Sequence, residues 1–144
     1  MVKIFADLAK ENGFPIEEFD NHMYAIHFPL QFEDEIKTQT IYFRDWFDDH
    51  FDRQTYYINT YLCDISSKID PYLILREADF GRLTILCIKK MTLEDGSHKE
   101  GLYIQSSIPV HFIQENYEEF MKVIFEVAAN ADYVLKLISA ENQN

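Results

Sequence analysis

The spacing of apolar side chains near the start of the chain predicts a helix. Ile4, Phe5 and Leu8 recur at helical spacing between residues 2 and 12. Gly13 follows directly, and glycine most readily takes the left-handed conformation in which many helices stop. The pattern therefore predicts a short amphipathic helix that ends at Gly13.

Alternation of apolar and polar residues then replaces the helical spacing and predicts three strands. The first covers residues 17–32, where one face carries Tyr24, Ile26, Phe28 and Leu30 and the other carries Ala25, His27 and Pro29. Because Pro29 cannot donate to a ladder, this strand either ends there or lies at the edge of a sheet. The second strand covers residues 37–46. The third, over residues 53–64, is rich in Tyr, Thr and Ile, which favour strands.

Asp70 and Pro71 form the clearest local signal in the chain. An Asp oxygen at the N-cap accepts the unpaired amides of a first helical turn, and proline loses no hydrogen bond at the next position. The helix that they predict runs to Ala78 and stops near Gly81. Beyond it, the pattern predicts a strand over 83–91, a hairpin turn over 94–97, a strand over 101–110 and a long amphipathic helix over 115–139, with Asn116 and Glu119 placed as in a capping box. The order α-β-β-β-α-β-β-α describes a single α+β domain over residues 1–144.

Composition supports one packed core and restricts the partners of the chain. Hydrophobic residues make up 47% of the 144 positions, which is enough for a core. The 13 Lys and Arg against 25 Asp and Glu give a net charge of −12, which repels phosphate backbones and anionic membranes. We therefore expect no nucleic-acid partner and no membrane association. Asp7 interrupts the N-terminal segment before a signal-peptide core forms, and Cys63 and Cys87 lie apart inside apolar runs, so we expect a cytoplasmic protein.

The sequence holds no arrangement of residues that is typical of a catalytic site. It lacks the nucleophile-elbow, dinucleotide-binding, phosphate-loop and zinc-protease motifs. The histidines are not spaced three or four residues apart, as helical metal ligands would be; they are His22, His27, His50, His98 and His111. We therefore expect a protein without enzymatic activity, without catalytic residues and without a cofactor.

An acidic and aromatic segment over residues 45–52 has three interpretations. One is a Ca²⁺ or Mg²⁺ site built from Asp45, Asp48, Asp49, His50 and Asp52. The alternating acids and central glycine of a calcium loop are missing, so we predict no metal site. The favoured interpretation is a solvated hairpin whose aromatic side chains fold back on the core. In the third, these side chains anchor a basic partner; they are Trp46, Phe47 and Phe51.

Two further apolar sets have more than one explanation. The third predicted strand is rich in tyrosine, which suits a half-wet binding face, but strand propensity alone selects tyrosine and ordinary sheet packing is favoured; these residues are Tyr56, Tyr57 and Tyr61. The predicted middle helix carries three consecutive apolar residues, Leu73, Ile74 and Leu75. Because they cover more than one face of the helix, one face must contact the N-terminal helix or a second subunit.

Two stretches of the chain carry a resemblance to a known fold. One is the middle helix running into a strand, over residues 72–83. The other runs from residues 101–104 through Ile108 and Pro109 into the final helix at residues 128–132. With the element order and the acidic charge, they resemble the type III secretion chaperone-like fold, and within it the YbjN-like family, which is described as bacterial sensory transduction regulators.

The resemblance implies a homodimer, a twisted antiparallel sheet packed against helices, and binding without catalysis. Members of the secretion-chaperone branch wrap an extended partner segment around hydrophobic patches. The helix with Leu73, Ile74 and Leu75 corresponds to the element that commonly forms the dimer contact in that fold.

Three hypotheses about function follow. The leading one is a small cytoplasmic binding protein, chaperone-like or regulatory, that works as a homodimer through the middle helix and binds a segment of a protein partner. The alternative is an acidic immunity or inhibitor protein, whose charge and loop 45–52 meet a basic toxin or nuclease by electrostatic steering. The third is a metal-dependent enzyme, which would require a divalent ion at Asp48, Asp49 and Asp52.

Overall fold

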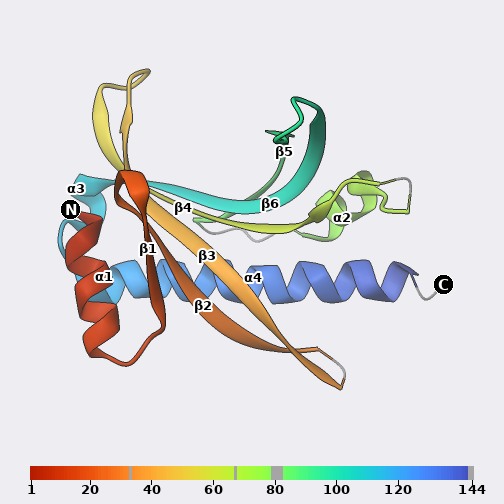
Figure 1. Cartoon of the computed structure of the whole chain (residues 1–144), viewed down its shortest axis with the longest axis horizontal. Helices are drawn as coiled ribbons and strands as arrows, with labels where there is room; N and C mark the ends of the chain where they lie inside the picture. Colours follow the sequence, from red (N-terminus) through yellow and green to blue (C-terminus); the bar gives the residue numbers. More distant parts are fainter. Residues whose placement is uncertain (33, 67, 79–82, 143–144) are drawn as a thin grey trace.

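The fold is that of a computed structural model, which describes residues 1–32, 34–66, 68–78 and 83–142. It is built on one open sheet with helices packed against it (Figure 1). The elements are, in chain order, α1 (Val2–Glu11), β1 (Ile16–Phe19), the 3-10 turn η1 (Asp20–His22), β2 (Met23–Phe32), β3 (Glu35–Asp48), β4 (Arg53–Asp64), α2 (Pro71–Glu77), β5 (Ile85–Thr92), β6 (His98–Pro109), α3 (Val110–Ile113) and α4 (Tyr117–Asn142).

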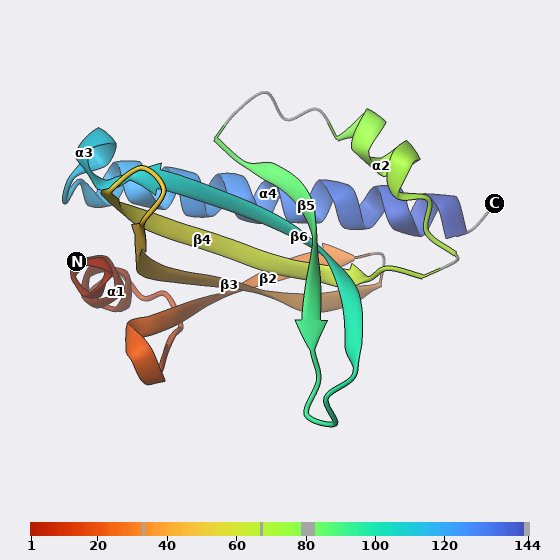
Figure 2. The ribbon, with the colours of Figure 1, turned by 90° about the horizontal axis from the view of Figure 1, so that it is seen from above.

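The sheet has six strands in the order β1-β2-β3-β4-β6-β5, and every neighbouring pair is antiparallel. β6 lies between β4 and β5, so β5, which precedes it in the chain, forms one edge of the sheet (Figure 2). At the other end, β1 covers only the first part of β2. Pro29 lies beyond β1, on the free edge of β2, as its missing N–H requires. The predicted α+β class is confirmed.

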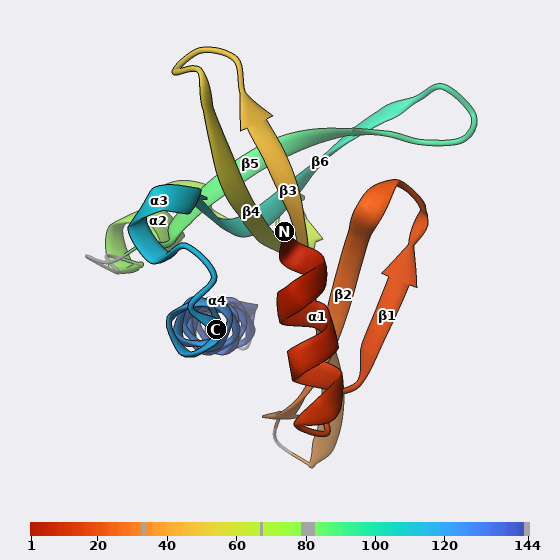
Figure 3. The ribbon, with the colours of Figure 1, turned by 90° about the vertical axis from the view of Figure 1, so that its left-hand side faces the viewer.

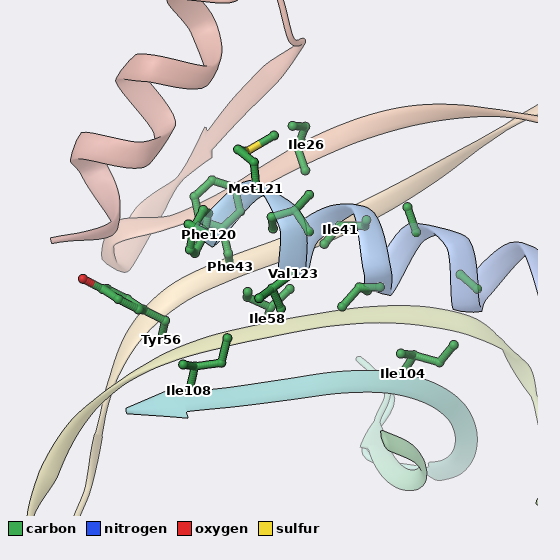
Figure 4. Close-up of a cluster of buried hydrophobic side chains, with 14 of the residues drawn as sticks. Ile26, Ile41, Phe43, Tyr56, Ile58, Ile104, Ile108, Phe120, Met121 and Val123 are labelled. Carbon is green, nitrogen blue, oxygen red and sulfur yellow. The ribbon is translucent and has the colours of Figure 1, made fainter. Parts of the chain in front are cut away.

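The hydrophobic core lies between the sheet and α4 (Figure 4). Its centre is a group of aromatic rings around Phe120, which belongs to the main apolar stripe of α4. Phe120 stacks on Phe5 of α1 with 4.2 Å between ring centroids, and its ring meets those of Phe43 and Tyr56 at 5.4 Å and 5.9 Å. Rings from α1, β3, β4 and α4 therefore join the first helix, the sheet and the last helix into one core.

Local signals in the sequence place several helix ends. Asp70 accepts hydrogen bonds from two amides of the first turn of α2, at 3.1 Å and 3.4 Å. Gly13 follows α1 with a φ of +88°, in the left-handed region. Asn116 accepts the backbone N–H of Glu119 at 3.2 Å, which is half of a capping box. The Glu119 carboxylate does not complete the box because it pairs with Lys122 at 2.9 Å.

The predicted strand over residues 17–32 is in fact two strands. β1 ends at Phe19, and the chain turns through η1 before β2 begins, so that Phe19 lies opposite Met23 and Ile16 lies opposite Ile26. His22 makes this turn with a φ of 59°. The prediction of one strand was wrong at this place, although the sequence carries Asp20 and Asn21 here, two residue types that favour turns.

Other boundaries also differ from the prediction. β3 continues to Asp48 and β4 begins at Arg53, so only residues 49–52 form the turn that was expected over 45–52. The fold also contains the short helix α3, which the predicted order lacks. α2 ends at Glu77, and the stop expected near Gly81 lies outside the described residues.

Candidate functional site

The sheet has one face covered by helices and one face without them. Side chains alternate along a strand, so Ile26, Ile41 and Ile58 point into the core while their neighbours point away from it. All helices of the described ranges lie on the same side of the sheet (Figure 3). We call the other side the open face. Its central side chains, all at least partly exposed, are Tyr42, Arg44, Trp46, Tyr57, Asn59, Tyr61, Cys87, Lys89, Tyr103 and Gln105.

Aromatic rings follow one another across the open face. Trp46 meets Tyr57 with 6.0 Å between ring centroids, and Tyr61 meets Tyr103 at 5.5 Å, both pairs edge to face. Gly101 makes room for the second pair, because a Cβ at this position would lie 3.0 Å from the rings of both Tyr61 and Tyr103. Any larger residue at Gly101 would therefore push these two rings apart.

The three tyrosines of the predicted third strand do not act together. Tyr56 is fully buried in the core, and its hydroxyl donates to the backbone oxygen of Gln114 at 2.6 Å. Tyr57 and Tyr61 lie on the open face instead. The structure therefore divides the set between ordinary packing and an exposed surface, which are the two explanations that the sequence offered.

Two cations converge on Tyr57 at the centre of the open face. The guanidinium of Arg44 lies 5.5 Å from the centroid of its ring, as in a cation–π contact, whereas the ammonium of Lys89 lies at the hydroxyl end of the ring, 4.7 Å from the centroid. Lys89 also donates a hydrogen bond to the Tyr57 hydroxyl, which donates to Gln105 at 2.8 Å. Partial burial, with a smaller effect from the charge of Arg44, lowers the pKa of Lys89.

A third cation on this face is already neutralised. Lys99 pairs with Asp64 at 3.0 Å, and the Asp64 carboxylate also accepts a hydrogen bond from Tyr61. The hydrogen bond from Tyr61 has the largest effect in lowering the pKa of the Asp64 carboxyl, and the hydrogen bond from Lys99 lowers it further. Burial and the same hydrogen bond raise the pKa of Tyr61.

The β3–β4 hairpin projects from the body of the molecule (Figure 1). Its aromatic side chains do not fold back on the core, contrary to the favoured interpretation of the sequence. Trp46 is 39% exposed, Phe47 is exposed as well, and Phe51 at the tip is 64% exposed. The Phe51 ring lies 4.7 Å from the His50 ring and 5.2 Å from the Arg53 guanidinium, both within the hairpin.

The acidic residues of this hairpin serve different local purposes. Asp45 accepts the backbone N–H of Val2 at 3.3 Å and so caps α1, while Asp48 accepts two amides of the turn at 3.1 Å and 3.3 Å. The exposed tip carries the remaining candidates, Asp49, His50 and Asp52. Among the described residues, no group of three His, Cys, Asp or Glu side chains is placed to hold a metal ion.

The three apolar residues of α2 have different surroundings. Ile74 is 1% exposed and belongs to the core of the single chain, and Leu73 is half-buried. Leu75 is 51% exposed, and Tyr72 beside it is also exposed. The exposed apolar surface of α2 is therefore formed by Leu75 and Tyr72, and Ile74 is not part of it.

Sequence reasoning missed the free edge at β5. Within the described ranges, β5 pairs with β6 alone, so the opposite edge of β5 has no strand beside it. Ile85 and Ile88 on this strand are exposed. The apolar run from Ile85 to Ile88 is a signal for a strand, but its place at the edge follows only from the insertion of β6 next to β4.

A cavity of about 420 Å³ lies where β3 and β4 separate. Their ladder runs only from Tyr42 opposite Asn59 to the hairpin. Beyond it, the Gln39 side chain bridges the strands by donating to the Tyr61 backbone oxygen at 2.9 Å. Leu135 of α4 also lines this cavity. Its wall is therefore partly apolar, from Leu135, and partly polar, from the side-chain amide of Gln39.

None of the helices in the described ranges is long and apolar enough to cross a membrane. Comparison with protein-family models, with curated proteins and with solved structures finds no match to this chain.

Proposed function

We propose that this chain is a non-enzymatic cytoplasmic binding protein, chaperone-like or regulatory, that acts as a homodimer and binds a segment of a protein partner. The observation that carries the proposal is the open face, where aromatic rings from β3, β4 and β6 remain partly exposed in the single chain. Tyrosine and tryptophan tolerate both water and apolar contact, which suits a surface that is alternately free and occupied. The proposal includes the type III secretion chaperone-like fold, with which an antiparallel sheet packed against helices on one face is compatible.

An extended segment is the form of partner that suits a sheet face best. Successive side chains of an extended chain point in opposite directions, so every second one meets the rings. Trp46 and Tyr57, on neighbouring strands and 6.0 Å apart between ring centroids, provide adjacent rings for such a contact. The test is a selection of random displayed peptides on the immobilised protein, with the double variant Trp46→Ser/Tyr57→Ser and the control Phe125→Ser, which alters an exposed ring on the helical side.

Peptides enriched by the wild-type protein and by Phe125→Ser, but not by Trp46→Ser/Tyr57→Ser, would support binding on the open face. Circular dichroism of each variant establishes that it is folded. If the folded wild-type protein enriches no peptide, capture of partner segments is wrong.

The homodimer is proposed to form through the exposed side of α2. Leu75 and Tyr72 are solvent-exposed apolar side chains on a helix whose opposite side packs in the core. The test is light scattering after size exclusion at low and high salt. A salt-resistant dimer that Leu75→Asp converts to a folded monomer supports the interface. Ile36→Asp places the same charge on an exposed isoleucine elsewhere and should leave the dimer intact; a monomeric wild-type protein would refute the homodimer.

A second function, inhibition of a basic toxin or nuclease, is favoured by the projecting hairpin. Its tip presents Phe51 together with Asp49 and Asp52, an apolar anchor surrounded by acids. Association of a basic protein would then weaken strongly as salt rises. It would also be lost in Phe51→Ala while Trp46→Ser/Tyr57→Ser retains it, which separates this function from binding on the open face.

A further inference from the structure

We propose that the segment bound on the open face is acidic, and that Arg44 and Lys89 together hold one of its carboxylates beside the Tyr57 ring. This inference rests on the proposed function and names the chemistry of the partner. It also assigns the anion-binding residues, which the sequence did not single out because they lie on β3 and β5 and come together only in the folded sheet.

The open face differs in charge from the rest of the molecule. The chain as a whole carries a net charge of −12. By strand alternation, however, the strand residues of the open face include four cations and three carboxylates, namely Arg44, Arg53, Lys89, Lys99, Glu17, Asp48 and Asp64. The acidic character of the protein therefore lies elsewhere, and this face is the one that a negatively charged segment approaches with least repulsion.

Each carboxylate of the open face already has a partner. Asp64 pairs with Lys99 at 3.0 Å, and Glu17 pairs with His27 at 3.2 Å. Asp48 accepts amides of the hairpin turn. Within the described parts of the chain, no carboxylate oxygen lies within 4.0 Å of a side-chain nitrogen of Arg44 or Lys89, the distance at which an ion pair forms.

Lys89 is the residue that most needs a counterion. Its ammonium is partly buried at the hydroxyl end of Tyr57, to which it donates a hydrogen bond, and lies 5.3 Å from the centroid of the Tyr103 ring. Arg44 lies 5.5 Å from the centroid of the Tyr57 ring. Partial loss of water and a neighbouring positive charge both disfavour a lone ammonium, as the lowered pKa of Lys89 reflects. A carboxylate that contacts both cations would offset both penalties, and charge-assisted hydrogen bonds to it are among the stronger polar contacts.

A polypeptide carboxylate fits this site better than a nucleic acid. A nucleic acid brings a charge at every phosphate, and most of these would face the strongly acidic remainder of the molecule. An extended peptide with one or two carboxylates brings few charges and places apolar side chains on Trp46 and Tyr103. One peptide would thus contact the aromatic rings with its apolar side chains and the two cations with its carboxylate.

Trp46 provides the readout because it is the only tryptophan in the chain and lies against Tyr57. We would sequence the peptides enriched by the wild-type protein, synthesise the most enriched one that lacks tryptophan, and titrate it while recording Trp46 fluorescence. The test variant is Arg44→Gln/Lys89→Met, in which methionine keeps an apolar stem against the rings. The matched control is Lys90→Gln, the next residue on β5, which points to the other face.

We expect enriched peptides to contain more Asp and Glu than the unselected library, and Arg44→Gln/Lys89→Met to bind about tenfold more weakly or worse. Lys90→Gln should bind within about twofold of wild type, as expected for an exposed charge. Enriched peptides without an acidic bias, or undiminished binding by the folded double variant, would overturn the inference but leave peptide binding intact. A single-stranded oligonucleotide that changes Trp46 fluorescence, and loses this effect in the double variant, would overturn it in favour of a nucleic-acid ligand.

Discussion

Replacing Ile74 by alanine tests whether α2 belongs to the core of the single chain. Ile74 is 1% exposed, whereas the adjacent Leu75 is 51% exposed. Both changes to alanine remove the same number of carbons. At about 0.8 kcal/mol per buried CH₂, lost burial costs roughly 2.5 kcal/mol at Ile74 and about half of that at Leu75. The cavity left at the enclosed Ile74 site adds to this cost, so the total there is about 3 kcal/mol.

Urea unfolding followed by far-UV circular dichroism measures both costs. All variants are compared at one protein concentration, low enough that the protein is monomeric, because a homodimer through α2 would bury Leu75 and its stability would depend on concentration. Ile74→Ala should unfold at a clearly lower urea concentration with an unchanged dependence on urea, and Leu75→Ala should lose about 1 kcal/mol. If Leu75→Ala costs the monomer as much as Ile74→Ala, the assignment of Ile74 to the core and of Leu75 to the surface of the single chain is wrong.

Three other predictions concern the core, a helix cap and the response to pH. Phe120→Ala removes the ring at the centre of the aromatic cluster and should cost about 3–5 kcal/mol in urea unfolding, whereas Phe125→Ala, at a ring that is 45% exposed, should cost less than about half of this; equal costs would contradict the assigned core. Asp70→Ala should lower the free energy of unfolding by about 1 kcal/mol by removing the cap of α2, and an unchanged urea midpoint would show that the cap is not needed. Burial, aided by nearby carboxylates, raises the pKa of Tyr56 to about 12, so the folded chain retains a proton that the unfolded chain releases above pH 10, and stability should fall between pH 10 and 12. Thermal melts across this range should show a shallower fall in Tyr56→Phe than in wild type or in Tyr72→Phe, which alters a surface ring; identical slopes for all three would refute this cause.

The sequence by itself determined much of the secondary structure. Asp70 and Pro71 predicted the start of α2 because a cap and a proline act on the backbone directly beside them. The third predicted strand, over residues 53–64, has the bounds of β4, and the apolar stripe of the last helix became the side of α4 that packs in the core. These signals are local, so no knowledge of distant residues was needed to find them.

The tertiary structure alone decided which apolar residues are buried. Ile74 and Leu75 are adjacent and similar in hydrophobicity, yet only the packing of α2 against α4 places the first in the core. The turn at η1 was also missed, because Asp20 and Asn21 lie within an alternating pattern that indicates one strand, and only the pairing of Phe19 with Met23 shows the chain reversal. The sequence likewise could not show that the aromatic rings of the β3–β4 hairpin are exposed, since their exposure depends on how far the hairpin extends beyond the body of the molecule.

The candidate site also depends on the tertiary structure. Arg44, Tyr57 and Lys89 come from three strands, and the chain gives no local sign that they meet. They come together because β6 pairs with β4 on one side and with β5 on the other, which brings Lys89 across to Tyr57. Strand order follows from pairing between distant segments, whereas hydrophobic alternation records only which way each side chain points. The sequence therefore determined the strands and their two faces, and the pairing of the strands decided which side chains share a site.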